Sequence, residues 1–193
     1  FLFLAGLSLV LAAEQRLERS GRRWQAAETV VRRGAEIFIL AFLFRLQAFI
    51  VSPGSWPVTM FKVDILNVLG PSTAIAGIVW GLTGGRRTAV LASAGIALLI
   101  AMMTPVIRVA PWIDTLPLWF QWYLRPFPDQ TTFTLFPWAG FVFAGATLGV
   151  LLSASTTPLA DRRLVRWIAL SGAGFLGAGF YAASLPSIYP VSS

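Results

Sequence analysis

The sequence predicts an all-α fold, a polytopic transmembrane helix bundle with five full spans and one truncated span at the N-terminus. Of the 193 residues, 56% are hydrophobic and only 12% are charged, about half the charged share of a soluble domain. Apolar runs long enough to cross a bilayer recur along the chain, and basic residues gather in alternate connections between them. The absence of Cys and His excludes disulfides, thiolate nucleophiles and a histidine base within this sequence, and no metal site is expected.

The apolar runs give the predicted elements in order. Residues 1–13 (FLFLAGLSLVLAA) are shorter than the roughly 20 residues that a span needs, so we interpret them as the end of a span that begins outside this sequence. A charged, helix-prone connection, 14–33, comes next. The five full spans are predicted at residues 34–52, 65–83, 88–107, 135–153 and 167–185. Together they form one partial transmembrane domain, residues 1–193.

The connections between the spans differ in charge, which predicts the orientation. Eleven arginines fall in three of them, 14–33, 84–87 and 154–166, whereas 53–64 and 108–134 carry only Lys62, Arg108 and Arg125. Because basic loops stay in the cytoplasm, the three arginine-rich connections are expected on the cytoplasmic side of the inner membrane. The net charge of +7 is thereby explained without nucleic acid as a partner. The expected partner of the spans is the lipid bilayer.

Arg45 lies inside a predicted span, about 10 Å below its outer end. A charge at depth costs at least about 2.5–3.5 kcal/mol, so Arg45 should face a partner or a wet cavity. Asp64, near the outer start of the next span, is the better placed partner, and we predict a polar cavity between the two spans. The alternative is that Arg45 extends to the outer headgroups and has no functional role.

Asp64 and Asn67 are three residues apart and therefore lie on one face of their helix. A carboxylate and an amide at a helix N-terminus can orient a polar substrate, so both are candidate catalytic residues. The alternative is a helix cap, because Asp is a favoured N-cap residue.

The outer connection 108–134 is dense in aromatic residues, and Trp119 and Trp122 are candidates for stacking on a sugar. An interfacial helix in the aromatic belt is the alternative. Glycines at 145 and 149, and at 172, 174, 177 and 179, form faces of small residues that favour close helix packing. On the cytoplasmic side, Arg32, Arg33, Arg86 and Arg87 are candidates for binding a phosphorylated donor. Membrane topology alone also explains these arginines.

Four short segments occur in the order found in a known family. They are FLFLAGLS (1–8), RRGAEIFIL (32–40), VDILNVLG (63–70) and LFPWAGFVFAGATLG (135–149). The chain resembles bacterial transmembrane acyltransferases related to the heparan-α-glucosaminide N-acetyltransferase catalytic domain. The resemblance covers most of the chain, and it assigns Asp64 and Asn67 to the lining of the site.

The resemblance implies an enzyme that moves an acyl (acetyl) group from cytoplasmic acyl-CoA to a sugar-like acceptor on the outer face. In the lysosomal relative the catalytic group is a lumenal His, which this sequence lacks. The catalytic residue therefore lies outside this fragment, or the fragment has no activity. A non-enzymatic membrane protein, either a small-molecule transporter or an assembly subunit, is the alternative function. The acceptor, the acyl chain and the oligomeric state, including a homo-oligomer, are left open.

Overall fold

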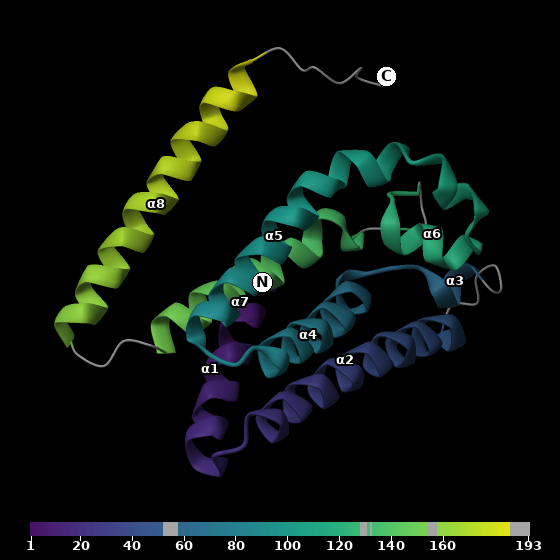
Figure 1. Ribbon diagram of the computed structural model, residues 1–193. Helices are drawn as coiled ribbons and strands as arrows, with labels where there is room; N and C mark the ends of the chain where they lie inside the picture. The colour runs from purple at the N-terminus through teal and green to yellow at the C-terminus, as the bar shows by residue number, and fades with distance from the viewer. Residues whose placement is uncertain (52–57, 128–130, 132, 154–157, 186–193) are drawn as a thin grey trace. The chain divides into compact units, whose positions relative to one another are not determined.

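A computed structural model describes residues 1–51, 58–127, 131, 133–153 and 158–185 (Figure 1). The described residues are helical apart from short connections and one isolated parallel bridge between Val63 and Thr131. The elements are α1 (Leu2–Ser20), α2 (Arg23–Val51), α3 (Val58–Phe61), α4 (Ile65–Leu82), α5 (Arg86–Val109), the 3-10 helix η1 (Pro111–Thr115), α6 (Leu118–Leu124), α7 (Leu135–Ser153) and α8 (Pro158–Ser184). The predicted all-α bundle is confirmed.

Four helices in the described part of the chain are long and apolar enough to cross a membrane, namely α2, α4, α5 and α7. They contain the spans predicted at 34–52, 65–83, 88–107 and 135–153. The exceptions are residue 83, which follows the end of α4, and residue 52, which lies outside the described residues. The two other predicted spans are helical but are not among these four. The span at 1–13 continues in α1 into a charged stretch, and the span at 167–185 overlaps α8, whose Gly and Ser residues lower its mean hydropathy.

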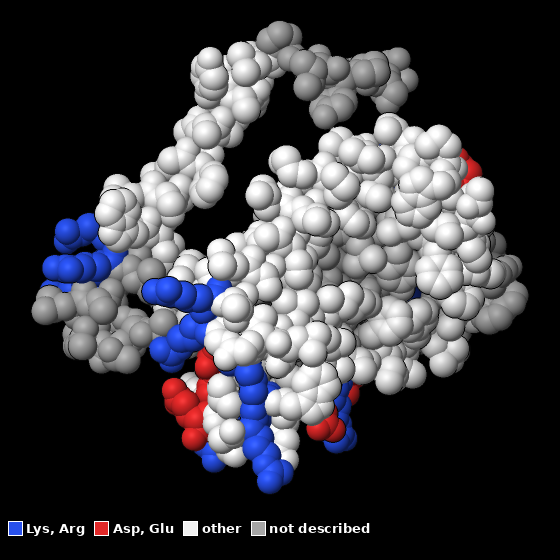
Figure 2. Space-filling view, in the orientation of Figure 1, with Lys and Arg blue, Asp and Glu red and all other residues white. Residues whose placement is uncertain are grey.

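The chain divides into two compact units, Phe1–Ala154 and Ser155–Ser193. The second unit contributes the single long helix α8. Within the first unit, the turns after α1 and after α4 lie at one end, and the segments after α2 and α5 lie at the other (Figure 1). This arrangement is the one that alternating spans require. In the face shown in Figure 2, basic side chains of the first unit gather at the end that holds the α1–α2 turn.

The predicted connection 14–33 is almost entirely helical. Its first half extends α1 to Ser20 and its second half starts α2 at Arg23, because most of its residues are good helix formers. Gly21 separates the two helices with a left-handed backbone (φ 66°), and its N–H donates to the Leu17 carbonyl oxygen at 2.8 Å. A residue with a side chain is disfavoured in this conformation, so Gly21 fixes the position of the turn.

Helices α1 and α7 pack with their backbones in contact. A Cβ atom on Gly145 would lie 1.9 Å from the Phe3 carbonyl oxygen, and one on Gly6 would lie 1.9 Å from the Val142 carbonyl oxygen. Gly149 lies against Leu7 in the same seam. The close packing predicted for Gly145 and Gly149 is therefore confirmed. Around the glycines at 172, 174, 177 and 179 of α8, no atom in the described part of the chain lies within 4 Å of the position of an added Cβ.

Helices α2 and α4 form a second close pair. A Cβ atom on Gly34 would lie 2.7 Å from the Ala74 backbone nitrogen, and one on Gly70 would lie 2.8 Å from Phe38. Gly77 approaches Val30 in the same way, at 2.6 Å. Small residues allow the two backbones to approach closely without a hydrophobic driving force in lipid. This seam fixes the C-terminal part of α2 beside the start of α4, where the candidate site lies.

Candidate functional site

The C-terminal part of α2 and the start of α4 are joined by an ion pair. The Arg45 guanidinium of α2 contacts the Asp64 carboxylate at the start of α4, and the two side chains are 18% and 39% exposed. The partner predicted for Arg45 is therefore the one that the structure shows. Because each charge neutralises the other, neither group has to face lipid alone.

Asp64 and Asn67 form a helix cap and also reach a third element. Asp64 is the N-cap residue of α4, and its backbone N–H donates to Asn67 Oδ1 at 3.1 Å. Asn67 Nδ2 donates to the Tyr123 hydroxyl of α6 at 3.3 Å, although the two residues are 56 positions apart. Asn67 is only 2% exposed and faces the protein interior. Asp64 occupies the predicted N-cap position, but the capping hydrogen bond runs from its backbone N–H to the Asn67 side chain, and the same amide also connects α4 to α6.

Tyr123 is a member of this polar group that sequence reasoning did not single out. Burial raises the pKa of the Tyr123 phenol above its ordinary value, and the hydrogen bond from Asn67 acts in the opposite direction. The phenol is therefore protonated at neutral pH. Its oxygen accepts from Asn67, and its O–H is available as a donor. No periodicity in the sequence connects Tyr123 with Asn67, because the contact depends on how α6 folds back over α4.

The two tryptophans predicted to stack on a sugar differ in accessibility. Trp119 is 41% exposed and lies beside Phe61, with 5.0 Å between the ring centroids. Trp122 is only 2% exposed, because it packs in a cluster with Val63 and Val68. Trp119 therefore offers ring surface to a ligand, whereas the ring of Trp122 is covered by its neighbours.

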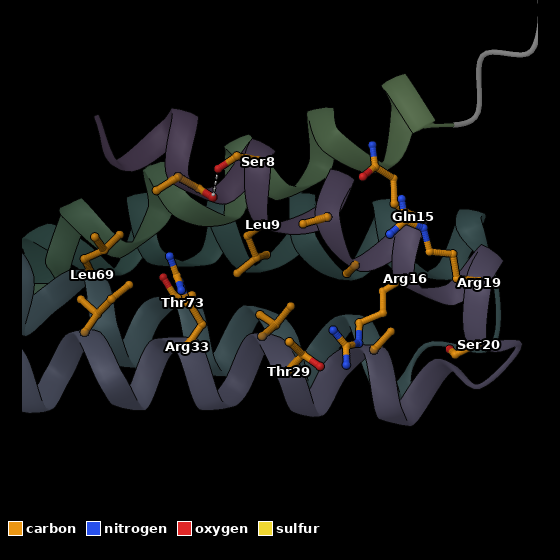
Figure 3. A pocket seen from close by; sticks show the side chains of 16 residues that line it. Ser8, Leu9, Gln15, Arg16, Arg19, Ser20, Thr29, Arg33, Leu69 and Thr73 are labelled. Carbon is orange, nitrogen blue, oxygen red and sulfur yellow. Dashed lines mark hydrogen bonds between the residues drawn. The ribbon is translucent and has the colours of Figure 1, made fainter.

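A groove with a volume of about 780 Å³ lies between α1 and α2, with α4 contributing to its wall (Figure 3). Small and apolar side chains line most of its length. Its lining residues are Ala5, Ser8, Leu9, Ala12, Ala13, Gln15, Arg16, Arg19, Ser20, Ala26, Thr29, Val30, Arg33, Ile37, Leu69 and Thr73. Figure 3 shows the groove running from Leu69 and Thr73 at one end to Arg19 and Ser20 at the other. The groove is thus apolar along its walls and basic toward the α1–α2 turn.

The structure brings together only part of the predicted arginine cluster. Arg33 lines the groove, and Arg32 lines an adjoining pocket of about 640 Å³ that also includes Arg33. Arg32 also forms an ion pair with Glu36 at 3.3 Å. Arg86 donates instead to the Ser153 carbonyl oxygen at 3.1 Å, and neither Arg86 nor Arg87 lines the groove or the adjoining pocket. The physical reason is that the α4–α5 turn lies at the same end of the bundle as the α1–α2 turn, but its residues do not form the walls of the groove (Figure 1).

Arg16 and Arg19 line the groove but were not among the predicted ligand-binding residues. Within the described part of the chain, neither has an ion-pair or hydrogen-bond partner, and Arg33 has none either. A signal for them was present in the sequence. Arg16 and Arg19 continue the helical spacing of Ala5, Ala12 and the other small residues on the same face of α1.

A buried polar cluster fixes the α1–α2 turn beside the groove. Trp80 Nε1 donates to Glu14 Oε1 at 3.1 Å, and Glu14 is 6% exposed. Arg23 covers the Trp80 ring at 4.1 Å and donates through Nε to the Trp80 carbonyl oxygen at 2.9 Å. These contacts connect α1 and α2 to the end of α4. They hold the Glu14 side of α1 against α4, which leaves the side with Arg16 and Arg19 toward the groove.

The predicted polar cavity between α2 and α4 is not one of the two pockets described above. Neither pocket is lined by Arg45, Asp64 or Asn67. Where Gly34 of α2 meets Gly70 of α4, the seam leaves no room between the two backbones. The polar group therefore lies at the end of this closed seam where the C-terminal part of α2 meets the start of α4, and the groove lies between α1 and α2 with α4 in its wall.

The comparisons with known proteins give one family. The family model described as heparan-α-glucosaminide N-acetyltransferase, catalytic, matches residues 1–178. No curated protein and no solved structure matches the chain.

Proposed function

Because the chain belongs to the heparan-α-glucosaminide N-acetyltransferase catalytic family of membrane acetyltransferase-like proteins, we propose that it moves an acetyl group across the membrane. The donor is acetyl-CoA, bound in the groove between α1 and α2 from the cytoplasmic side of an inner membrane. The acceptor is a sugar-like amine or alcohol, bound at the opposite end of α4. The observation that supports this proposal best is the course of the groove. It begins at Arg16 and Arg19 and extends along α4 to Leu69, about 3 Å of helix rise from Asn67.

The donor end of the groove suits a ligand with phosphates and a long, narrow arm. Guanidinium groups bind phosphate oxygens in a two-pronged geometry, and Arg16 and Arg19 at this end have no carboxylate partner among the described residues. Beyond these arginines the walls are formed by Ala12, Val30 and other small or apolar residues. An acyl-CoA would place its phosphates at the basic end and its arm along these walls.

The acceptor end supplies polar groups that can orient a sugar and stabilise charge. In the proposed reaction the amine or hydroxyl of the acceptor attacks the thioester carbonyl carbon, a C–N or C–O bond forms, the C–S bond breaks, and the leaving CoA thiolate takes up the proton that the acceptor loses. The carbonyl oxygen becomes negative as the acceptor attacks, and the Asn67 amide is a candidate donor to it. Asp64, fixed by Arg45, is a candidate for orienting the acceptor. The exposed ring of Trp119 is a candidate for stacking on a sugar.

We expect the Asn67→Ala variant of the complete protein to lose transfer activity by at least about tenfold, the effect of one lost transition-state hydrogen bond. Acetyl-CoA binding should be nearly unchanged, because Asn67 does not line the groove. The measurement is the rate of radiolabelled acetyl transfer from acetyl-CoA to glucosamine by purified protein.

Two further variants separate catalysis from helix capping. Asn67→Asp keeps an oxygen that can accept the Asp64 N–H but has no amide donor, so it should be as inactive as the alanine variant. Ser72→Ala is the control, because the Ser72 hydroxyl is also buried on α4 but donates to the Val68 carbonyl oxygen of its own helix. If Asn67→Ala or Asn67→Asp transfers acetyl at the wild-type rate, Asn67 is a helix cap and has no catalytic role.

A further inference from the structure

At the Leu69 end of the groove, the hydroxyl of a largely buried threonine has no hydrogen-bond partner in the described part of the chain. Thr73 of α4 is 5% exposed and lines the groove, yet its hydroxyl makes no hydrogen bond within the described residues. Threonine and serine in a helix commonly donate to the carbonyl oxygen four residues earlier. Thr104 and Thr147 of this chain do so, at 2.7 and 2.9 Å. The hydroxyl of Thr73 is therefore available to a ligand in the groove.

The surroundings of Thr73 restrict the kind of ligand that would use this hydroxyl. Leu69 and Ile37 are apolar neighbours in the lining, and Arg33 extends from α2 toward the end of the groove where Thr73 lies (Figure 3). Burying a charged acceptor against a mainly apolar wall costs desolvation energy, so an uncharged acceptor atom such as an amide or thioester carbonyl oxygen suits the Thr73 hydroxyl better. The phosphates of the same ligand have their own partners nearer the α1–α2 turn, in Arg16 and Arg19.

The length of the groove allows both ends of one ligand to bind at once. Along α1 the lining extends from Ala5 to Ser20, which corresponds to about 22 Å of helix. Thr73 and Leu69 lie at one end of this length, and Arg19 lies at the other (Figure 3). A ligand that reaches Thr73 from the arginines must be extended, narrow and largely uncharged beyond its phosphates.

We infer that Thr73 binds the pantetheine arm of an acyl-CoA, with its Oγ1–H donating to an amide carbonyl oxygen of the arm. This inference rests on the proposed function, because it takes the donor site in the groove as its starting point. It gives Thr73 the role of a positioning residue. By fixing the arm, Thr73 sets how far the thioester reaches along α4 toward Leu69 and the polar group at Asn67.

The test is a binding measurement on the complete protein in lipid nanodiscs, with two probes. One probe is CoA, and the other is its phosphoadenosine nucleotide without the pantetheine arm. Thr73→Val keeps the shape of the side chain and removes the hydroxyl, so CoA affinity should fall about tenfold while nucleotide affinity is unchanged. Thr73→Ser should restore CoA affinity. Substitution of Arg16 and Arg19 by Ala should lower the affinity for both probes.

Thr147→Val is the matched control, because it removes a helix threonine of α7 whose hydroxyl already donates within its own helix. It should bind both probes like the wild type. The inference is overturned if Thr73→Val binds CoA with wild-type affinity, or if it weakens nucleotide binding as much as CoA binding. Binding needs no turnover, so tight CoA binding without acetyl transfer would overturn the proposed function and leave this inference intact. A wild-type protein that binds neither probe would overturn both.

Discussion

Removing one charge of the Arg45–Asp64 pair should destabilise the protein by about 2 kcal/mol or more, because the other charge is left without a partner where the C-terminal part of α2 meets the start of α4. Arg45→Met keeps the apolar stem of the side chain, and Asp64→Asn keeps a good N-cap residue, so each variant removes mainly the charge. The double variant should be more stable than the sum of the two single losses predicts. The measurement is a double-mutant cycle on thermal stability in detergent.

The exposed pair Arg32–Glu36 on α2 is the control for this cycle. Its side chains are 82% and 49% exposed, and exposed pairs of this kind contribute about 0–1 kcal/mol. We expect nearly additive effects there and a coupling well above that range for Arg45 and Asp64. Additive losses at Arg45 and Asp64 would show that the pair has no role in holding α2 against α4.

The second large effect is expected at the seam between α1 and α7. Gly145→Leu should prevent folding, because even a Cβ at this position would lie 1.9 Å from the Phe3 carbonyl oxygen. Overpacking in a core commonly costs about 1–3 kcal/mol, and the cost is higher where the obstacle is a backbone that cannot move aside. The measurement is the yield of monodisperse protein after membrane extraction.

Gly95→Leu on α5 is the matched control, because no atom in the described part of the chain lies within 4 Å of a Cβ added there. This variant should be extracted in wild-type yield. A wild-type yield for Gly145→Leu would contradict the backbone contact between α1 and α7.

The spans could be predicted from the sequence because each depends on local information. An apolar run that ends at an arginine-rich turn or at a proline fixes a helix in lipid almost alone, as for α4 and α5. The position of the α1–α2 turn was less predictable. Its charged residues are compatible with either a loop or a helix, and only Gly21 shows where the chain turns.

The candidate site was predictable to the extent that its residues are close in the sequence or complementary in charge. Asp64 and Asn67 share one helix turn, and Arg45 needed a carboxylate, which Asp64 supplies. The contribution of Tyr123 was not predictable, because it depends on how α6 folds onto α4. The groove between α1 and α2 was missed for a similar reason. Which arginines line it depends on the rotation of α1, which the buried contact between Glu14 and Trp80 fixes.

The most direct test of the proposed cross-membrane transfer is its sidedness in vesicles that hold the complete protein in one known orientation. Radiolabelled acetyl-CoA is supplied on one side and glucosamine on the other. Label should reach glucosamine only when the donor is on the side of Arg16 and Arg19, and the Arg16→Ala and Arg19→Ala double variant should lower the rate at limiting donor. Transfer that is equally fast with the donor on the side of Thr131, or absent from both sides, would contradict the proposal.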